Sequence, residues 1–157
     1  MRHLVRALSL LSLLCFAHVA QAADARAIVD GYMAAWNAHD ADQAATFLAD
    51  DAVYFDATVG TPQNGMTAAR DNVIKVFVGA VPDLKWEMTS APIVSADGIA
   101  FQWKFSGTNS GDWSAETKAT GKPLSFEGVS FIRIKDGKIA YQGDYYDALG
   151  FNKQLGW

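Results

Sequence analysis

The segment from Phe126 to Tyr146 is rich in aromatic and branched residues and is interrupted by one turn signal, Asp136-Gly137. Such a pattern predicts two antiparallel strands joined by a tight turn. Asp144 is the one acidic residue in the second of these strands. Because an unpaired carboxyl group is costly to bury, the face of the sheet that Asp144 occupies constrains how the rest of the chain can pack.

The length of the turn decides which face that is. A three-residue turn with Gly137 in the left-handed position pairs Ile134 with Lys138. Asp144 then lies opposite Gly128, which leaves room beside the carboxyl group. A two-residue Asp-Gly turn would move the pairing by one residue and turn Asp144 to the other face.

We favour the three-residue turn because it gathers hydrogen-bonding groups around Asp144. In that register, the face of Asp144 also carries Phe126, Gly128, Ser130, Ile132, Ala140, Gln142 and Tyr146. Ser130, Gln142 and Tyr146 can each form hydrogen bonds with a ligand or with the carboxyl group. The sequence therefore predicts a mainly apolar pocket wall with polar groups at a few positions.

The opposite face of the same hairpin is aromatic. It carries Phe131, Tyr141 and Tyr145, with Glu127 and Arg133 at its rim. An exposed aromatic patch of this kind is typical of an interaction surface. We therefore expect a homodimer formed by sheet-to-sheet packing, provided that no helix covers this outer face.

The first 22 residues have the pattern of a secretory signal peptide. Arg2 and Arg6 precede the apolar run Leu8–Ala20, which leads into a small-x-small cleavage triplet ending at Ala22. The apolar run is short for a membrane-spanning helix. We expect cleavage after Ala22, a periplasmic or secreted protein without a membrane span, and a single domain over residues 23–157.

Removal of this segment changes which chemistry is available. Loss of Arg2 and Arg6 lowers the basic residues from 13 to 11 against 17 acidic ones, so the net charge moves from −4 to −6. That balance argues against nucleic acid as a partner. The remaining chain has no cysteine and one histidine, His39, which excludes disulfides, thiol nucleophiles and Cys/His zinc sites. With no glycine-rich phosphate loop either, we expect neither a metal nor a cofactor.

Helices precede strands along the chain. Periodicity predicts helices over residues 23–38, 40–48 and 66–80 and a short strand over residues 52–56. From Leu84 onward, alternation with period two predicts long antiparallel strands. This order predicts an α+β domain in which a curved antiparallel sheet wraps around about three N-terminal helices as a cone-shaped α+β barrel. Its natural cavity lies between the concave sheet face and the first helix.

Five short motifs follow one another along the chain: Val81-Pro82-Asp83-Leu84, Ser106-Gly107-Thr108-Asn109-Ser110-Gly111, Ala119-Thr120-Gly121-Lys122, Asp136-Gly137-Lys138-Ile139 and Gln154-Leu155-Gly156. In this order they make the chain resemble the SnoaL-like polyketide cyclases, a branch of the nuclear-transport-factor-like superfamily. The resemblance covers nearly the whole chain after residue 22. It implies a general acid/base on the last strand, at Asp144 or Asp147, and the pairing favours Asp144. Asn109 and Gln142 stand where this branch usually has histidines.

The first half also resembles ketosteroid isomerase, which has the same fold, over the stretch GYMAAWNAHDADQAATFLADDAVYFDATVG. This resemblance implies that Tyr32 corresponds to the tyrosine that donates to an oxyanion. It likewise implies that Asp56 corresponds to the aspartate that shuttles the proton. Ser130 stands where the isomerase has a protonated aspartic acid in its oxyanion hole.

Each of these side chains also has a structural interpretation. Asp56 either points inward after its apolar strand, where desolvation would raise its proton affinity, or lies exposed at the start of a loop. Tyr32 either donates its phenol to a ligand or packs in the core. His39 ends the first helix, where a cation complements the helix dipole, so we expect a structural role for it.

Two functions fit these residues. The first is a cofactor-free enzyme that acts on a small hydrophobic carbonyl compound by proton transfer, as an isomerase or an aldol-type cyclase, with Asp144, Asp56 and Tyr32 as catalytic candidates. The candidates for substrate binding are Ser130, Gln142, Tyr146, Phe126, Trp36 and Asp147. The second is a non-catalytic module that holds the same kind of ligand in the cavity.

Overall fold

The computed structural model describes residues 24–95 and 97–157, so the expected signal peptide lies outside the described residues. The first helix covers residues 24–37, and the other helical segments are α2 (Ala41–Ala45), α3 (Met66–Ala69), η1 (Arg70–Ile74), α4 (Lys75–Ala80) and α5 (Ala148–Leu155). The strands are β1 (Leu48–Asp56), β2 (Gln63–Asn64), β3 (Lys85–Met88), β4 (Ile93–Val94), β5 (Gly98–Thr108), β6 (Pro123–Lys135) and β7 (Lys138–Tyr146). None of the described helices is both long and apolar enough to cross a membrane.

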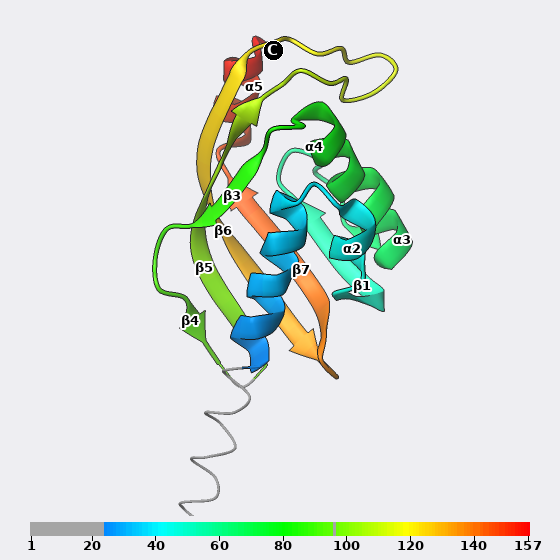
Figure 1. Cartoon of the computed structure of the whole chain (residues 1–157), viewed down its shortest axis with the longest axis vertical. Coiled ribbons are helices and arrows are strands. Elements are labelled where there is room, and N and C mark those ends of the chain that lie inside the picture. Colours follow the sequence, from blue (N-terminus) through cyan, green and yellow to red (C-terminus); the bar gives the residue numbers. More distant parts are fainter. Residues whose placement is uncertain (1–23, 96) are drawn as a thin grey trace, which may run out of the picture.

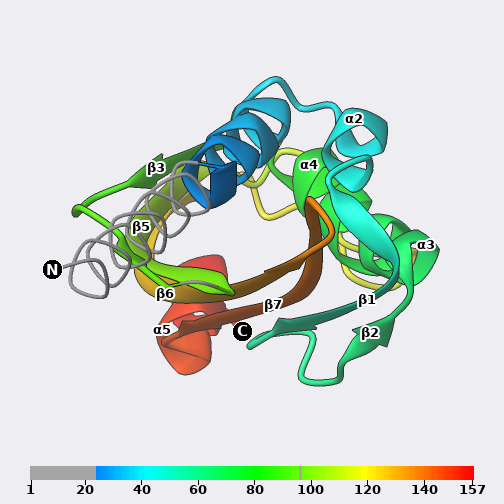
Figure 2. The same cartoon turned by 90° about the horizontal axis from the view of Figure 1, so that it is seen from below.

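All seven strands form one curved sheet in the order β2-β1-β7-β6-β5-β3, with β4 also paired to β5. The first helix, α2 and the stretch from α3 to α4 lie on its concave side (Figures 1 and 2). β1 runs parallel to β7, and the other strand pairs are antiparallel. The predicted α+β class and the curved sheet are confirmed, with one parallel pair that the sequence did not indicate.

The helical stretch from α3 to α4 matches the predicted helix over residues 66–80. Ala69, Val73, Phe77 and Ala80, which the periodicity places on one face, are all buried. Between α3 and α4 the chain passes through one wider, π-helical segment, η1. The buried stripe presses against the concave side of the sheet and supplies one wall of the interior.

Two helices differ from the sequence prediction. α2 begins after Asp40, whose side chain accepts a hydrogen bond of 2.8 Å from the Gln43 N–H, but it ends at Ala45 rather than near residue 48. α5 was not predicted at all. Asp147 caps its start by accepting a 2.9 Å hydrogen bond from the Gly150 N–H, and Gly156 ends it with a φ of 89°. An aspartate before a helix and a glycine after it are recognised end signals, so the sequence did indicate where α5 begins and ends.

The hairpin between β6 and β7 corrects the predicted turn. Lys135 pairs with Lys138, so the turn has two residues, and both Asp136 (φ 52°) and Gly137 (φ 74°) have positive φ. A β-bulge at Ala140, which has no partner on β6, then shifts the register by one further residue. As a result, Asp144 returns to the face that the three-residue turn predicted.

The opposite residue nevertheless differs from the prediction. Asp144 pairs with Ser130, and Gly128 pairs with Tyr146. A Cβ atom on Gly128 would lie 2.4 Å from Cζ2 of Trp103, so the space at this glycine is taken up by the indole ring. Gly128 therefore makes room for the core, and the prediction that it makes room for a ligand was wrong.

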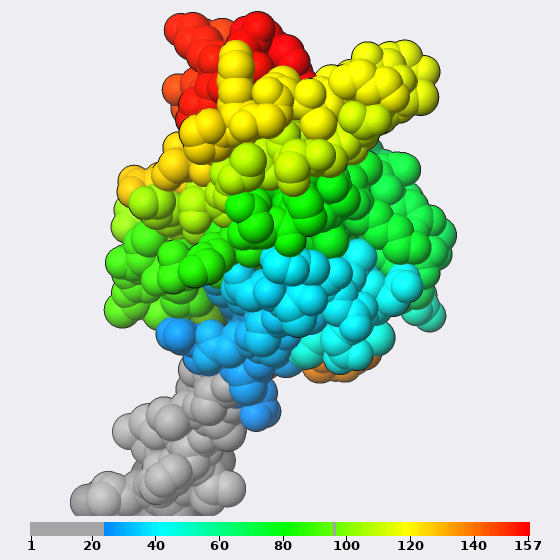
Figure 3. All heavy atoms as spheres, turned by 45° about the horizontal axis from the view of Figure 1, so that its top comes forward, coloured from blue at the N-terminus to red at the C-terminus, as the bar shows by residue number. Residues whose placement is uncertain are grey.

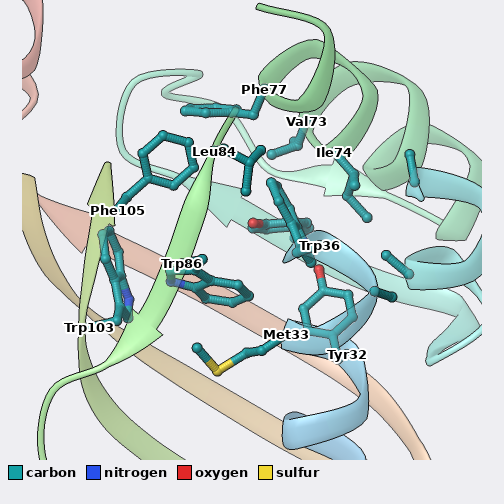
Figure 4. Packing of buried hydrophobic residues seen from close by; sticks show 14 of the residues in the cluster. Tyr32, Met33, Trp36, Val73, Ile74, Phe77, Leu84, Trp86, Trp103 and Phe105 are labelled. Atoms are coloured by element: carbon teal, nitrogen blue, oxygen red, sulfur yellow. The ribbon is translucent and has the colours of Figure 1, made fainter. Parts of the chain in front are cut away.

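Aromatic side chains fill the interior between the helices and the sheet. Trp36 and Trp86 have ring centroids 5.5 Å apart, and Phe77 and Phe105 have ring centroids 5.8 Å apart (Figure 4). α5 and the loop over residues 109–122 lie together at one end of the molecule (Figure 3). There Phe151 of α5 packs against Phe77 and against residues of β6 and β7. α5 thereby closes one end of the cone.

Candidate functional site

A buried carboxyl group, that of Asp144, is the centre of a hydrogen-bond network on the concave face of the sheet. Its Oδ2 accepts from the Tyr54 hydroxyl (2.6 Å) and from Gln142 Nε2 (2.9 Å). Its Oδ1 accepts from the Ser130 hydroxyl (2.5 Å). Three donors from three strands therefore hold one carboxyl group in place.

Trp103 extends this network into the aromatic core. The indole Nε1–H of Trp103 can only donate, and it donates to Ser130 Oγ at 2.8 Å. Ser130 in turn donates its hydroxyl proton to Asp144 Oδ1. Ser130 therefore links the core indole to the carboxyl group.

Burial raises the pKa of Asp144 to about 7, because the ionised carboxylate loses its hydration. The hydrogen bonds from Ser130 and Tyr54 act in the opposite direction, and the nearby charge of Asp56 raises the pKa further. A group with a pKa near neutrality can both accept and release a proton under physiological conditions. This is the property expected of a general acid/base.

Asp56 is the second carboxyl group on this face. It ends β1 at the position that pairs with Asp144 across the parallel β1–β7 ladder. Its side chain is 4 % exposed and accepts hydrogen bonds from Tyr146 O–H (2.9 Å) and from the N–H and O–H groups of Thr58 (2.9 and 2.7 Å). Of the two interpretations left open by the sequence, the structure supports the inward one.

The two aspartates line a small cavity. Its polar wall consists of Tyr54, Asp56, Asp144 and Tyr146, and its apolar wall consists of Trp36, Phe77, Trp86, Trp103, Phe105 and Phe126. The empty space measures about 310 Å³, part of it open to solvent, and about 30 Å³ of it can hold the centre of a water molecule. The structure thus brings five predicted site residues to one cavity, namely Asp144, Asp56, Tyr146, Phe126 and Trp36.

Tyr32 lies beneath this cavity and is fully buried on the first helix. Its hydroxyl points towards Trp36 (Figure 4), and burial raises the pKa of the phenol above its usual value. Within the described residues, four buried side-chain polar atoms have no hydrogen-bond partner: Trp113 Nε1 and, close to Tyr32, the cluster of Tyr32 Oη, Trp36 Nε1 and Gln142 Oε1. Each is costly to leave unpaired, so this cluster is suited to a bound water or a polar ligand group.

Other candidates lie outside the cavity. Asp147 is exposed and caps α5, so the structure gives it a helix-capping role and does not place it among the residues that line the cavity. Asn109 is buried but donates to the carbonyl groups of Ala80 and Gly111, which anchors the loop after β5. His39 has its Nε2 3.1 Å from the carbonyl oxygen of Leu84, in keeping with the expected structural role.

Two residues of the network were missed by the sequence analysis. Tyr54 lies two residues before Asp56 on β1, so the alternation of a strand could have placed both on the same face. Trp103 joins the network through its hydrogen bond to Ser130. No local signal identifies that link, because it joins neighbouring strands of the sheet.

The family model described as SnoaL-like polyketide cyclase matches residues 26–155. The chain belongs to the SnoaL-like polyketide cyclase family. No curated protein sequence gives a match.

Solved structures of SnoaL-like and related proteins share this fold. TsrD from Streptomyces laurentii has a TM-score of 0.71 and 24% identity, over 85% of this chain and 96% of that chain. AclR from Streptomyces galilaeus has a TM-score of 0.72 and 23% identity, over 86% of this chain and 82% of AclR. A third structure is that of a Catenulispora acidiphila protein with a ketosteroid isomerase-like fold, in complex with trimethylamine. It has a TM-score of 0.68 and 19% identity, over 82% of this chain and 92% of that chain. At these identities the similarity describes the fold.

Asp144 makes the stability of this SnoaL-like domain depend on pH. The folded state holds a proton on Asp144 up to about pH 7, whereas an unfolded aspartate releases it near pH 4. The free energy of unfolding should therefore fall by about 4 kcal/mol as the pH rises from about 4 to about 7. Asp144→Asn should remove this component.

Urea denaturation of both proteins at several pH values between 4 and 7 measures the difference. Asp51→Asn, at an exposed position on the same strand as Asp56, is the matched control and should follow the wild type. Parallel pH profiles for the wild type and Asp144→Asn would contradict the assignment.

Proposed function

We propose that this SnoaL-like protein is a cofactor-free enzyme that moves a proton at an acidic carbon of a small hydrophobic carbonyl compound, as an isomerase or an aldol-type cyclase. The observation that carries the proposal is the buried Asp144 carboxyl group, with a pKa of about 7, on the wall of a mainly aromatic cavity. A general acid/base works best when its pKa lies close to the working pH. Membership of the SnoaL-like family supports the same reaction class.

The chemical step balances without a co-reactant. The Asp144 carboxylate takes the proton from the carbon next to the carbonyl group, and the C–H electron pair forms a C=C bond while the carbonyl oxygen becomes an enolate. In an isomerase, protonated Asp144 then returns the proton to another carbon of the enolate system. In a cyclase, the enolate carbon attacks a second carbonyl carbon of the same molecule, the π electrons of that carbonyl move to its oxygen, and protonated Asp144 gives its proton to the resulting alkoxide. Asp56 is the second acid/base, and Tyr146 O–H orients it.

The hydrogen bonds around Asp144 change the roles of two of the three candidate donors. The Ser130 O–H and the Gln142 N–H already donate to Asp144, so we assign both to positioning that group. The hydroxyl of Tyr32 has no partner among the described residues and keeps its proposed role as a donor to an oxyanion, directly or through a water molecule.

The alternative is a binding module of the same fold without turnover. The aromatic wall supports this alternative equally well, because apolar cavities with a few polar groups are typical of ligand sites in general. The Catenulispora protein of this fold was crystallised with a small organic molecule, which agrees with either function. Catalysed proton exchange at a carbon of the ligand distinguishes the enzyme from the binding module.

Hydrogen–deuterium exchange at carbon tests turnover without knowledge of the final product. We expect the wild-type protein to accelerate exchange in D₂O for some members of a panel of small apolar ketones, followed by NMR. Asp144→Asn should slow this exchange by about 10²–10⁴-fold, because it removes the proton acceptor.

Asp56→Asn should also reduce the rate, whereas exposed Asp51→Asn should not change it. Retained exchange in Asp144→Asn would exclude this mechanism. Binding of the ketones with no exchange in the wild type would favour the binding module.

We also propose that the protein is exported, on the strength of the pattern of its first 22 residues. Expression of the full sequence in a Gram-negative host should give periplasmic protein whose intact mass corresponds to a chain that starts at Ala23. Leu13→Arg breaks the apolar run and should keep the protein inside the cell at full length. Full-length wild-type protein in the cytosol would rule out export.

A homodimer through the outer sheet face is a further part of the proposal. Phe131 is 51% exposed and Tyr145 is 41% exposed, and these rings pack edge to face beside an exposed Arg133. The same face forms a groove that extends to Ile93 and Tyr141. An apolar surface of this kind supports association of two sheets.

Light scattering coupled to size-exclusion chromatography should report a dimer at micromolar concentration. Phe131→Glu should shift it to monomer, because a charged side chain would then be buried in the interface. Leu149→Glu, at a 63% exposed position on α5, is the matched control and should remain dimeric. Monomeric wild type at this concentration would end the dimer hypothesis.

A further inference from the structure

The cavity beside Asp144 has an unusual balance of charge. Two carboxyl groups, those of Asp56 and Asp144, line it, and the other lining residues are aromatic. No lysine, arginine or histidine is among the lining residues that the structure describes. A carboxylate or phosphate on a ligand would face these two acids without a compensating cation, which is strongly unfavourable in a buried site.

The cavity also offers more hydrogen-bond acceptors than free donors. The hydroxyl groups of Tyr54 and Tyr146 line it, but they donate to Asp144 and Asp56 respectively. The Nε1–H of Trp103 is likewise used by Ser130, which leaves the Nε1–H of Trp36 as the free donor among the described lining residues. A ligand that only accepts hydrogen bonds therefore finds one indole N–H, whereas a ligand that brings donors or positive charge finds two carboxyl groups.

Six aromatic rings form the other wall, and they include three indoles, those of Trp36, Trp86 and Trp103. The face of an aromatic ring carries partial negative charge and attracts an organic cation, and indole does so most strongly. Trp86 lies between the other two, with ring centroids 5.5 Å from Trp36 and 6.2 Å from Trp103. Both walls of the cavity thus favour the same kind of ligand group.

We propose that the ligand of this cavity carries a small organic cation, an ammonium or alkylated ammonium group, held between the indole rings and the two carboxyl groups. This inference rests on the proposed function and narrows its substrate class to amine-bearing carbonyl compounds. The positive charge would also stabilise the enolate formed when Asp144 takes the proton, in a cavity that supplies few donors of its own.

The charge of the site changes with the ionisation of Asp144. The titratable groups that face Asp144 are Tyr54 and Asp56 from β1, Tyr146 from β7 and Tyr32 from the first helix. Burial raises the pKa of all three tyrosines, so they remain neutral and only the two carboxyl groups bring negative charge. A bound cation should therefore be held more tightly above pH 7 than below it.

Three probes of matched shape and different charge test the inference: tetramethylammonium, tert-butanol and pivalate. NMR titration of the indole N–H signals of the wild-type protein at pH 8 should show tetramethylammonium binding roughly tenfold or more tighter than tert-butanol. Pivalate should not bind. Tetramethylammonium should lose most of that advantage in Asp56→Asn and at pH 5, and keep it in exposed Asp51→Asn.

Equal or tighter binding of tert-butanol, or any binding of pivalate at the same signals, would overturn the inference. The wild-type ligand series needs no variant, so a failure of Asp56→Asn to fold leaves the test intact. If neutral ketones exchange deuterium in the turnover assay while tetramethylammonium shows no preference, this inference fails and the proposed function stands. If tetramethylammonium binds with the expected preference but no carbonyl compound exchanges, the inferred charge preference stands and turnover fails.

Discussion

The site depends on how this fold satisfies one buried carboxyl group. Asp144 is 5% exposed, and such a group is tolerated inside a protein only when it is hydrogen-bonded or neutral. Three donors form hydrogen bonds with the Asp144 carboxyl group, and burial raises its pKa to about 7, so that it is largely neutral below this pH. The local structure of β1, β6 and β7 is consistent with this requirement, since each strand supplies one of the donors.

The same requirement links packing to chemistry. Trp103 packs in the aromatic core and at the same time donates a hydrogen bond to Ser130, which in turn donates to Asp144. A change in the core at Trp103 would therefore alter the acid/base group through one hydrogen bond. Because the aromatic wall excludes water, the electrostatic effect of each charge inside the cavity is larger than it would be at the surface.

Much of the fold could be predicted from the sequence, and the site less well. The helical face of Ala69, Val73 and Phe77 was predicted because its periodicity is local. The face occupied by Asp144 was also predicted, but from a three-residue turn that does not form. The two-residue turn and the bulge at Ala140 each shift the strand pairing by one residue, so together they leave Asp144 on the predicted face. The sequence around Ala140 carries no signal that requires a bulge.

The sequence by itself determined the order of helices and strands and the alternation of side chains along each strand of the hairpin, because these follow from residue type and local periodicity. The tertiary structure decided which groups surround Asp144. Tyr54 reaches it from 90 residues away through the parallel pairing of β1 with β7. That pairing is set by burial of the whole sheet around the helices, which no short stretch of sequence encodes.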